Sequence, residues 1–469
     1  MKKPSHRNKS LPKNKSDQGK TDAPNPVQPL AASLQQQLDK LPLDSLARAS
    51  GFRRRQPKKL GPRLFVHAAC LLVTLGSVSY RRWAGLIGVL GGCTLAKQSL
   101  FERMTPRAVA FLQSVLGALL GTLATTPVPV PAALRGFGRV LVQDSTTLQL
   151  SEKLARYFPG ASNQKGAQGG MLKIQACYDL LSQSFVRFSL SSYRRNDQAA
   201  SPEVLSLVRA GDLILRDLGY FVLEVLEQIA TAHAYFLSRL RLGVGIWEAD
   251  GCTPVNLLRR LRSCPGNFEG QFCLGKEKLL VRLVAVRLSA EVAAQRRRKA
   301  RQNRDRRSAP SVQRLALLGW GIFITNVPAT RLSARAVAQV YGLRWRIETI
   351  FKAWKSYFAL TEVPAGSKAQ VEALIHAKLI FITLFQVCFW RRWWAGLDAQ
   401  GRPALSLLKV AQAVQSYLLV LVLSRSGVDL ALAWEQLLNT HCRYERRRRR
   451  HFMQDVQGNG GAPLRSKMN

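Results

Sequence analysis

Hydrophobic residues divide the chain into a helical first part and an α/β second part. From about residue 31 to 135, apolar residues recur at helical spacing, and we expect helices around residues 63–76, 79–90 and 94–119. Short apolar runs bounded by polar residues then predict buried strands. These strands are expected at residues 139–142, 171–180, 184–192, 213–215 and 234–241, with helices at 200–210 and 221–232. Strands that alternate with helices in this way indicate a mixed α/β sheet.

The α/β pattern is interrupted once and then resumes. Residues 242–318 contain short strand-like pieces and a dense basic run, whereas a strand at 319–326 is followed by a helix from about residue 333. We therefore expect a chain of several segments. They are a disordered basic tail at 1–30, a helical region at 31–135, an α/β domain in two parts at 136–241 and 319–375, an insertion subdomain at 242–318 and a helical C-terminal region with a basic tail at 376–469.

The segment YGLRWRIETIFKAWKSYF, at residues 341–358, is predicted to be one amphipathic helix. At about 100° per residue, its residues Tyr341, Arg344, Glu348 and Lys355 fall within roughly 60° of one another. A carboxylate flanked by cations suits a metal ligand beside a phosphate, but the same spacing also gives ordinary charge pairs along a helix. A second stripe at helical spacing can pack on a core: Ile347, Ile350, Phe351, Trp354 and Phe358.

Two aspartates stand where buried strands are predicted to end. Asp144 closes the run at 139–142, and Asp217 closes the run at 213–215, whereas Asp212 precedes its strand and belongs at the opposite edge. Ligands bind at the carboxyl ends of strands in α/β sheets, although a single Asp there is also typical of a turn or a helix cap. With Glu348, the two aspartates could hold two Mg²⁺ or Mn²⁺ ions for phosphoryl transfer.

The charge of the chain points to a polyanionic partner. Lys and Arg total 70 against 28 Asp and Glu, a net charge of +42, which favours nucleic acid, with a membrane surface as the other candidate. Two apolar stretches, at 64–80 and 111–134, each fall short of the about 20 unbroken apolar residues that a membrane span needs. We expect at least one of the basic runs, at 296–307 and 446–450, to contact phosphates rather than serve only as a solvated tail.

The cysteines and the N-terminal segment indicate a cytoplasmic protein. None of the eight cysteines forms a CxxC pair, so neither a zinc site nor a disulfide framework is expected, and reduced thiols are the default. The first thirty residues carry charge without an apolar segment, which is not the pattern of a secretory signal.

The spacing Tyr341-x2-Arg344-x3-Glu348-x6-Lys355 matches the signature of DDE transposases of the insertion-sequence-four family. The sequences QDSTT at Asp144 and DLGYF at Asp217 also resemble that family. The resemblance extends over about residues 140–375 and, loosely, over the N-terminal helical region, which is then expected to bind DNA.

This resemblance implies a ribonuclease H-like catalytic domain interrupted by a β-rich insertion. Asp144, Asp217 and Glu348 would be its catalytic, metal-binding triad. It also implies cut-and-paste transposition through end nicking, a hairpin step and strand transfer. The remaining signature residues, Tyr341, Arg344 and Lys355, would contact phosphates of the terminal DNA. A base-stacking aromatic of such transposases would correspond to Trp320, although a buried core tryptophan is the alternative reading.

The partners that follow are double-stranded DNA with terminal inverted repeats, target DNA and a second copy of the chain in a synaptic homodimer. The expected location is the cytoplasm of a prokaryote, in association with the nucleoid. Two alternatives stay open: a catalytically inactive, transposase-derived DNA-binding protein, and another ribonuclease H-like nuclease.

Overall fold

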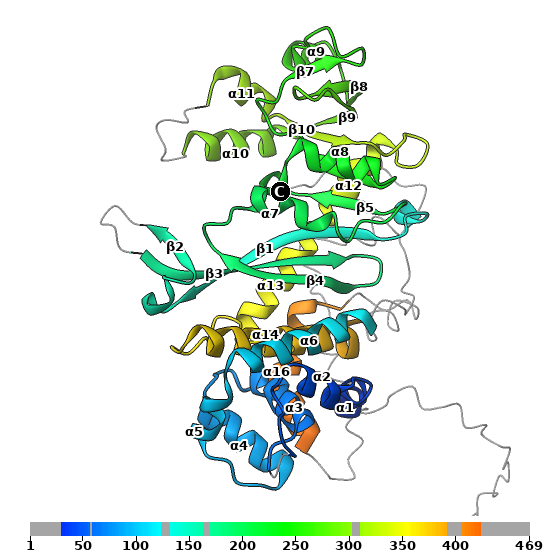
Figure 1. Cartoon of the computed structure of the whole chain (residues 1–469). Coiled ribbons are helices and arrows are strands. Elements are labelled where there is room, and N and C mark those ends of the chain that lie inside the picture. The colour runs from blue at the N-terminus through cyan, green and yellow to red at the C-terminus, as the bar shows by residue number, and fades with distance from the viewer. Residues whose placement is uncertain are drawn as a thin grey trace, which may run out of the picture.

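One mixed sheet runs through the middle of the molecule, with helices below it and an inserted segment above it (Figure 1). The computed structural model describes residues 30–56, 59–122, 132–162, 168–302, 310–391 and 405–423. Its strands are β1 (Val140–Leu150), β2 (Pro159–Ser162), β3 (Gln168–Asp179), β4 (Ser184–Ser192), β5 (Leu213–Arg216), β6 (Tyr235–Arg239), β7 (Ile246–Glu248), β8 (Phe268–Leu274), β9 (Leu279–Arg287) and β10 (Trp320–Thr325).

The strand order confirms the predicted mixed α/β sheet with a β-rich insertion. The order is β2-β3-β1-β5-β6-β10-β9-β8-β7, and β4 pairs with β3. Strands β1, β5 and β6 are parallel to one another, whereas β3, β4 and the strands from β7 to β10 pair in an antiparallel manner. The inserted strands therefore continue the same sheet through the β9–β10 pairing.

Helices account for most of the remaining described residues. They are α1 (Leu30–Asp39), α2 (Leu43–Ala49), α3 (Pro62–Leu72), α4 (Tyr80–Gly91), α5 (Lys97–Arg103), α6 (Pro106–Thr122), α7 (Asp197–Ala200), α8 (Leu223–Thr231), α9 (Leu257–Arg262), α10 (Ala290–Arg301), α11 (Val312–Leu317), α12 (Ala334–Gly342), α13 (Trp345–Tyr357), α14 (Lys368–Phe385) and α16 (Leu407–Leu423). Short 3₁₀ turns are η1 (Val73–Leu75), η2 (Ala132–Leu134), η3 (Glu152–Leu154), η4 (Ser201–Val204) and η5 (Leu218–Tyr220), and η7 (Gln386–Arg391) is a π-helical turn.

Several predicted elements differ from the observed ones. The helix expected at 94–119 is two helices, α5 and α6, which meet at 76° because Pro106 begins the second one. The helix expected at 200–210 was wrong: after α7 the chain forms only the 3₁₀ turn η4, which has Pro202 near its start. Strand β1 extends eight residues beyond the predicted 139–142, because antiparallel pairing with β3 continues to Leu150.

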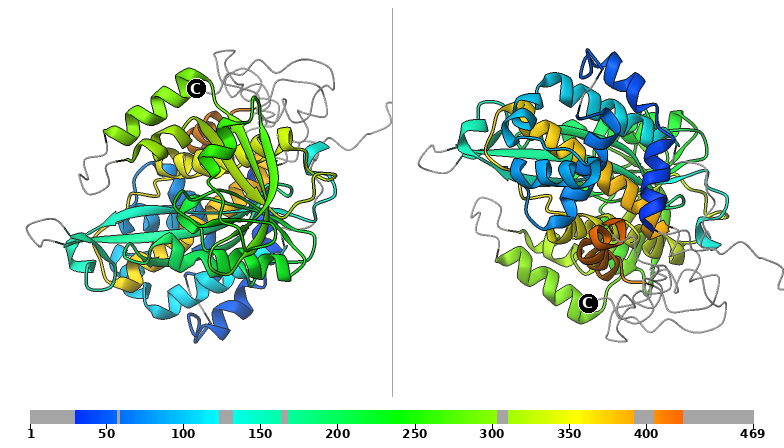
Figure 2. Two further views of the ribbon diagram at one scale, coloured as in Figure 1. Left: turned by 90° about the horizontal axis from the view of Figure 1, so that it is seen from above. Right: turned by 90° about the horizontal axis from the view of Figure 1, so that it is seen from below.

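The core is built around α14, which packs against α6 and α3 (Figure 2). Together with the following turn, the segment Lys368–Trp390 is long and apolar enough to cross a membrane, but 94% of its most apolar stretch is buried inside the protein. Its apolar composition is therefore explained by its place in the core, where it joins helices from both ends of the chain. The predicted domain boundary at residue 375 falls within this helix.

A buried lysine connects α14 to the end of α13. Lys378 has no exposed surface, and its Nζ donates hydrogen bonds of 2.6 Å to the carbonyl oxygens of Ala359 and Glu362. Ala359 has a left-handed backbone with φ 47°, so these bonds hold an unfavourable turn in place. Burial lowers the pKa of Lys378 to about 7, against the opposing charge of Glu362. A neutral amine has two N–H donors, one for each carbonyl.

We expect the contribution of Lys378 to stability to grow as the pH rises above about 7. The pKa is about 7 in the folded chain and near 10.5 in the unfolded chain, so between these values only the unfolded chain binds the proton. The free energy of unfolding, relative to Lys378→Met, should therefore rise across this window by at most about 1.4 kcal/mol per pH unit. Urea unfolding of both proteins at several pH values measures the difference, and a constant difference would contradict the expectation.

Candidate active site

Three acidic residues from three separate elements face one another at the middle of the sheet. Asp144 lies on β1, Asp217 directly follows β5 and caps the turn η5, and Glu348 is in the first turn of α13. Strand β1 pairs with β5 at residues 140–142 and 213–215. We had predicted Asp144 at the end of its strand, but it lies within the longer strand β1. It still lies just beyond the segment of β1 that pairs with β5.

The Arg344 guanidinium lies among the three carboxylates. Its Nη1 is 3.6 Å from Oδ2 of Asp144, and its Nη2 is 3.4 Å from Oδ1 of Asp217 and 3.0 Å from Oε1 of Glu348. Only 6% of Arg344 is exposed. The structure thus brings together the three predicted acids and one of the predicted DNA-binding residues.

The signature segment is not one helix, as the sequence predicted, but two. Helix α12 ends at Gly342 and α13 begins at Trp345, which leaves Arg344 as the residue that precedes the second helix. At the junction, the N–H groups of residues 343, 344, 346 and 347 donate to the carbonyl three residues earlier, the pattern of a tighter 3₁₀ turn. This junction places Arg344 over the acids on β1 and β5.

Burial raises the pKa of two acids of the site, Asp144 and Glu348. Burial raises the pKa of Asp144 to about 7, against the effects of the Ser145 N–H and of Arg344, while the charges of Asp217 and Glu348 raise it further. Burial also raises the pKa of Glu348, again opposed by Arg344. For Arg344, burial acts against the charge, but the neighbouring acids and Tyr341 raise its pKa above the usual value. The site therefore has more negative charge than one guanidinium neutralises.

The three carboxylates have the right chemistry for a hard divalent cation, because Mg²⁺ and Mn²⁺ prefer oxygen ligands. In the described part of the chain, however, no group of three or more His, Cys, Asp or Glu side chains is arranged closely enough to hold a metal ion together. At this site the Arg344 guanidinium lies between the acids. The carboxylate oxygens of the three acids are suitable ligands for a divalent cation. Such a cation would have to replace contacts that Arg344 makes with these carboxylates.

The other predicted site residues are placed less centrally. Tyr341 is 6% exposed, packs its ring 5.2 Å from that of Phe323, and has its pKa raised to about 12 by burial. Lys355 is exposed on α13 and forms no ion pair with any described acid. Of the charge pairs in the alternative reading of this helix, Arg344 pairs with Glu348 at 3.0 Å, whereas no pair between Glu348 and Lys355 is present among the described residues.

Trp320 begins β10, far along the sheet from β1. It is partly buried against the apolar cluster that the insertion shares with the sheet, and the Arg287 guanidinium carbon lies 5.7 Å from its ring centroid. This packing favours the core reading, and base stacking by Trp320 stays a prediction.

The structure adds an aromatic residue that we had not predicted. Trp345 is 60% exposed, and the guanidinium carbon of Arg344 lies 5.3 Å from its ring centroid. A large apolar side chain at the surface beside the three acids is suited to contact a ligand. The available signal was that Trp345 falls outside the buried stripe of α13, which leaves an aromatic ring on the solvent side.

A fourth carboxylate also went unnoticed. Oδ1 of Asp197 accepts hydrogen bonds from Ser145 Oγ at 3.0 Å and from Gln175 Nε2 at 3.3 Å, and lies 3.1 Å from Lys173 Nζ. It therefore supports β1 and β3 next to Asp144. No sequence pattern singled it out, because its partners come from distant strands.

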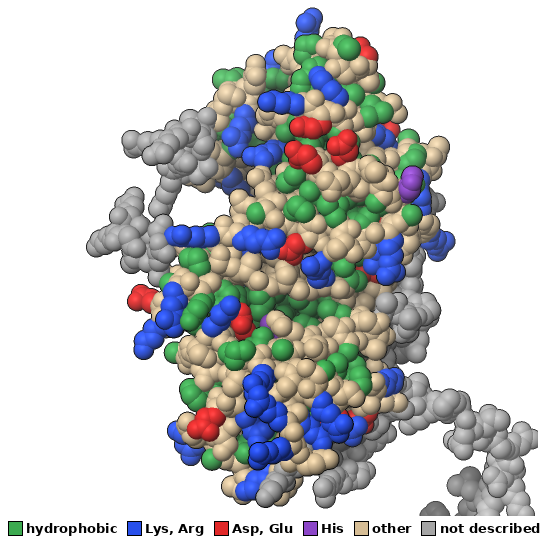
Figure 3. Space-filling model, viewed as in Figure 1, with side chains coloured by type: hydrophobic (Ala, Val, Ile, Leu, Met, Phe, Trp, Pro, Cys, Tyr) green, Lys and Arg blue, Asp and Glu red, His purple; other side chains and the backbone are tan. Residues whose placement is uncertain are grey.

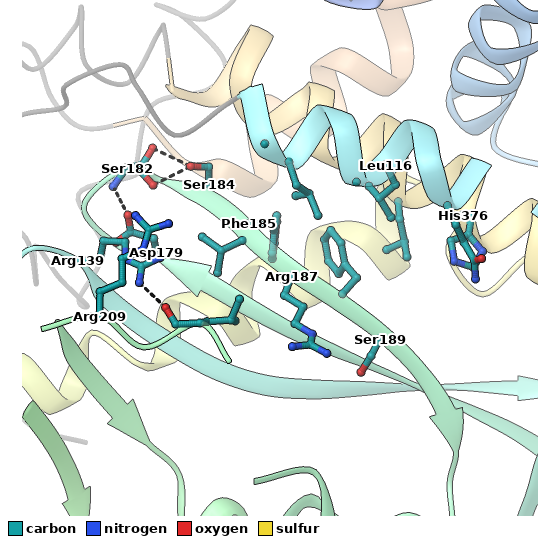
Figure 4. Close-up of a pocket in the computed structure, with 18 of the residues that line it drawn as sticks. Leu116, Arg139, Asp179, Ser182, Ser184, Phe185, Arg187, Ser189, Arg209 and His376 are labelled. Atoms are coloured by element: carbon teal, nitrogen blue, oxygen red, sulfur yellow. Dashed lines mark hydrogen bonds between the residues drawn. The ribbon is translucent and has the colours of Figure 1, made fainter. Parts of the chain in front are cut away.

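The surface carries clusters of cations, and one groove lies away from the three acids. Lys and Arg side chains gather over the N-terminal helices and around α10 in Figure 3. Of the two predicted basic runs, residues 296–302 are described, while residues 303–307 and 446–450 lie outside the described ranges. A groove of about 1200 Å³ between α6, β4 and α14 is lined by Arg139, Asp179, Arg187 and His376 and contains none of the three acids (Figure 4).

Comparisons with known proteins agree with the signature. The family model described as "Transposase DDE domain" matches residues 135–384. The transposase for insertion sequence element IS231E of Bacillus thuringiensis subsp. finitimus is 28% identical over 84% of this chain and 86% of its own length. The transposase for insertion sequence element IS1151 of Clostridium perfringens is 24% identical over 62% of this chain and 65% of its own.

Among solved structures, the chain is similar to piggyBac transposase in its synaptic complex with hairpin DNA. The identity is 10%, the TM-score is 0.41, and the match covers 87% of this chain and 85% of that one. This overlap is below the level at which a shared fold follows, so the family rests on the sequence. Since the family model spans more than half of the chain, including all three acids and the signature, the chain belongs to the family of transposases with a DDE domain.

Proposed function

We propose that this transposase moves an insertion sequence by cut-and-paste transposition, with Asp144, Asp217 and Glu348 as its metal-binding catalytic residues. The observation that carries the proposal is the convergence of these three carboxylates, from three elements, on the single guanidinium of Arg344. The steps would be nicking at the element ends, a hairpin intermediate and strand transfer. Two Mg²⁺ or Mn²⁺ ions at the carboxylates would activate the attacking oxygen and stabilise the leaving oxygen.

The residues of the chain itself prepare the site for this chemistry. With a pKa of about 7, Asp144 is partly protonated near neutral pH, and a carboxyl must lose its proton before it can act as a ligand. Before a metal ion binds, Arg344 holds the three acids together through its contacts with their carboxylates. Once its contacts to the acids are replaced, its planar fork can bind a phosphate through two parallel hydrogen bonds.

The remaining contacts to DNA would be electrostatic and apolar. Tyr341 and Lys355 would contact phosphates of the cleaved ends, and the surplus of Lys and Arg would hold the duplex without reading its sequence. The partners would be the terminal inverted repeats, target DNA and a second copy of the chain, in the cytoplasm at the nucleoid.

Each acid of the triad can be tested by a substitution that removes its charge. Asp144→Asn, Asp217→Asn and Glu348→Gln should each abolish metal-dependent nicking, because loss of one ligand misplaces the reacting groups at a cost of several kcal/mol in the barrier. Binding of end DNA should persist. Gel assays of nicking and of binding separate the two effects, and strand transfer from pre-cut ends separates a transposase from another nuclease.

The control for the triad is Glu372→Gln, which removes a partly buried acid that pairs with Lys368 on α14. This variant should nick DNA like the wild type. If Glu348→Gln also nicks at the wild-type rate, Glu348 is not a metal ligand. If neither the wild type nor any variant nicks DNA, an inactive DNA-binding protein becomes the better interpretation.

The second prediction concerns the fork of Arg344. Arg344→Ala should weaken complexes with cleaved ends and slow hairpin formation and transfer, and Arg344→Lys should restore only part of this loss because it keeps the charge without the fork. Arg335→Ala, which removes an exposed charge from α12, is the matched control. Equal binding of cleaved ends by Arg344→Ala and wild type, together with a lower melting temperature, would show that Arg344 only stabilises the fold.

The third prediction compares two tryptophans. Trp345→Ala should weaken binding of cleaved ends by about 1–3 kcal/mol, the usual loss for one base that stacks on an aromatic ring, with little change in melting temperature. Trp320→Ala should instead lower the melting temperature, since it removes a side chain packed in the insertion core. Fluorescence of 2-aminopurine at the terminal positions reports stacking directly, and quenching that survives Trp345→Ala but is lost in Trp320→Ala would assign stacking to Trp320.

A further inference from the structure

The residues that directly precede the two aspartates bond to each other. Gln143 comes before Asp144 on β1, and Arg216 comes before Asp217 on β5. Both are buried, at 3% and 0% exposure, and Nη1 of Arg216 donates to Oε1 of Gln143 at 2.6 Å. Because side chains alternate along a strand, this bond lies on the face of the sheet opposite to Asp144.

The bond takes the place of a missing backbone contact. The parallel register of β1 and β5 pairs residues 140, 141 and 142 with 213, 214 and 215, and goes no further. Continuing the same register would set Gln143 beside Arg216 and Asp144 beside Asp217. Beyond this point β1 keeps only its pairing with β3, which runs from residue 141 to 150. The Arg216–Gln143 pair therefore acts as the last rung between the two strands, one residue before the acids.

The same guanidinium also holds the turn after Asp217. Nη2 of Arg216 donates to the carbonyl oxygen of Tyr220 at 3.0 Å and to that of Ser201 at 3.3 Å, and it also contacts Ser201 Oγ. Asp217 caps this turn by accepting a bond from the Gly219 N–H at 3.2 Å. On the other strand, Nε2 of Gln143 donates to the Ala200 carbonyl at 3.0 Å. The Arg216–Gln143 pair, which we call the clasp, thus fixes the backbone next to Asp144 and the backbone next to Asp217.

The other end of the same two strands shows what a purely structural pair looks like. There, Arg139 binds Asp212 through two bonds, of 2.5 Å from Nη2 and 3.2 Å from Nε. Arg216, in contrast, is fully buried and has no ion pair with any described carboxylate. A buried cation with only neutral acceptors costs stability. Its position directly before Asp217, with bonds to the residue before Asp144 and to the turn after Asp217, points to a role in the placement of the two acids.

We propose that Arg216 and Gln143 are positioning residues that set the separation of Asp144 and Asp217, so that the two carboxylates can share a divalent cation. The inference rests on the proposed function of the triad. Neither residue touches the cation or the DNA, and both act through the backbone that carries the acids.

The test measures metal binding apart from activity. Arg216→Met and Gln143→Met remove the donor and the acceptor with little change in volume, and Arg139→Met breaks the pair at the far end of the same strands. Mn²⁺ affinity of the full chain without DNA is measured by calorimetry, with the melting temperature as a readout of folding. The two clasp variants should lose roughly 10- to 100-fold in Mn²⁺ affinity, the range found when groups that orient metal ligands are removed.

Two further readouts separate positioning from folding. The Mg²⁺ concentration for half-maximal nicking should rise by the same factor in both clasp variants. Arg139→Met should lower the melting temperature but leave the Mn²⁺ affinity within about twofold of wild type. Gln143→Glu keeps an acceptor for Arg216 and should restore most of the affinity. If a Met variant does not fold, Gln143→Asn, which withdraws the acceptor by one methylene, gives the same comparison.

The outcomes distinguish this inference from the proposed function. If Asp144→Asn abolishes nicking but the clasp variants bind Mn²⁺ like the wild type, or no worse than Arg139→Met, the inference is overturned and the triad stands. If Asp144→Asn nicks and binds Mn²⁺ normally, the triad itself fails. A selective loss in the clasp variants, together with rescue by Gln143→Glu, supports the inference.

Discussion

The arrangement of the site depends on one interaction, the contact of the Arg344 guanidinium with three carboxylates. Asp144, Asp217 and Glu348 come from separate elements, and three negative charges at this spacing repel one another. Arg344 is only 6% exposed, and burial, to which the repulsion of Asp217 and Glu348 adds, raises the pKa of Asp144 to about 7. The Arg344 guanidinium allows the three carboxylates to lie close together, and the surrounding backbone positions this side chain between them.

The position of Arg344 depends on the break between α12 and α13. A continuous helix would carry residue 344 in a regular position along its axis. The tighter turn at 343–347 instead ends one helix and begins another, which points Arg344 at the ends of the paired segments of β1 and β5. The other end of α13 is fixed as well, by the buried Lys378 and the left-handed turn at Ala359. Basic side chains, Arg344 and Lys378, thus hold the signature helix at both ends.

The sequence revealed the parts of this arrangement that depend on local pattern. Runs of apolar residues located the paired segments of β1 and β5, and the positions of Asp144 and Asp217 after those runs marked the acids. The helix expected at 200–210 and the single helix through Tyr341 failed, because local periodicity does not register a 3₁₀ turn. The Arg216–Gln143 bond joins residues 73 positions apart and leaves no local pattern at all.

Two buried basic side chains, Lys378 and Arg216, bond to neutral oxygen atoms, whereas Arg344 contacts three carboxylates. Lys378 bonds to two backbone carbonyls, and Arg216 bonds to an amide, a hydroxyl and carbonyls. Neutral acceptors stabilise such cations less than a carboxylate does, but they add no further negative charge near the triad. Gln143 lies on the opposite face of the sheet from Asp144, and as a neutral amide it binds Arg216 without adding a charge to the strand. The choice of Gln143 there keeps the strands joined and leaves the charge of the three acids to Arg344 and to whichever cation replaces it.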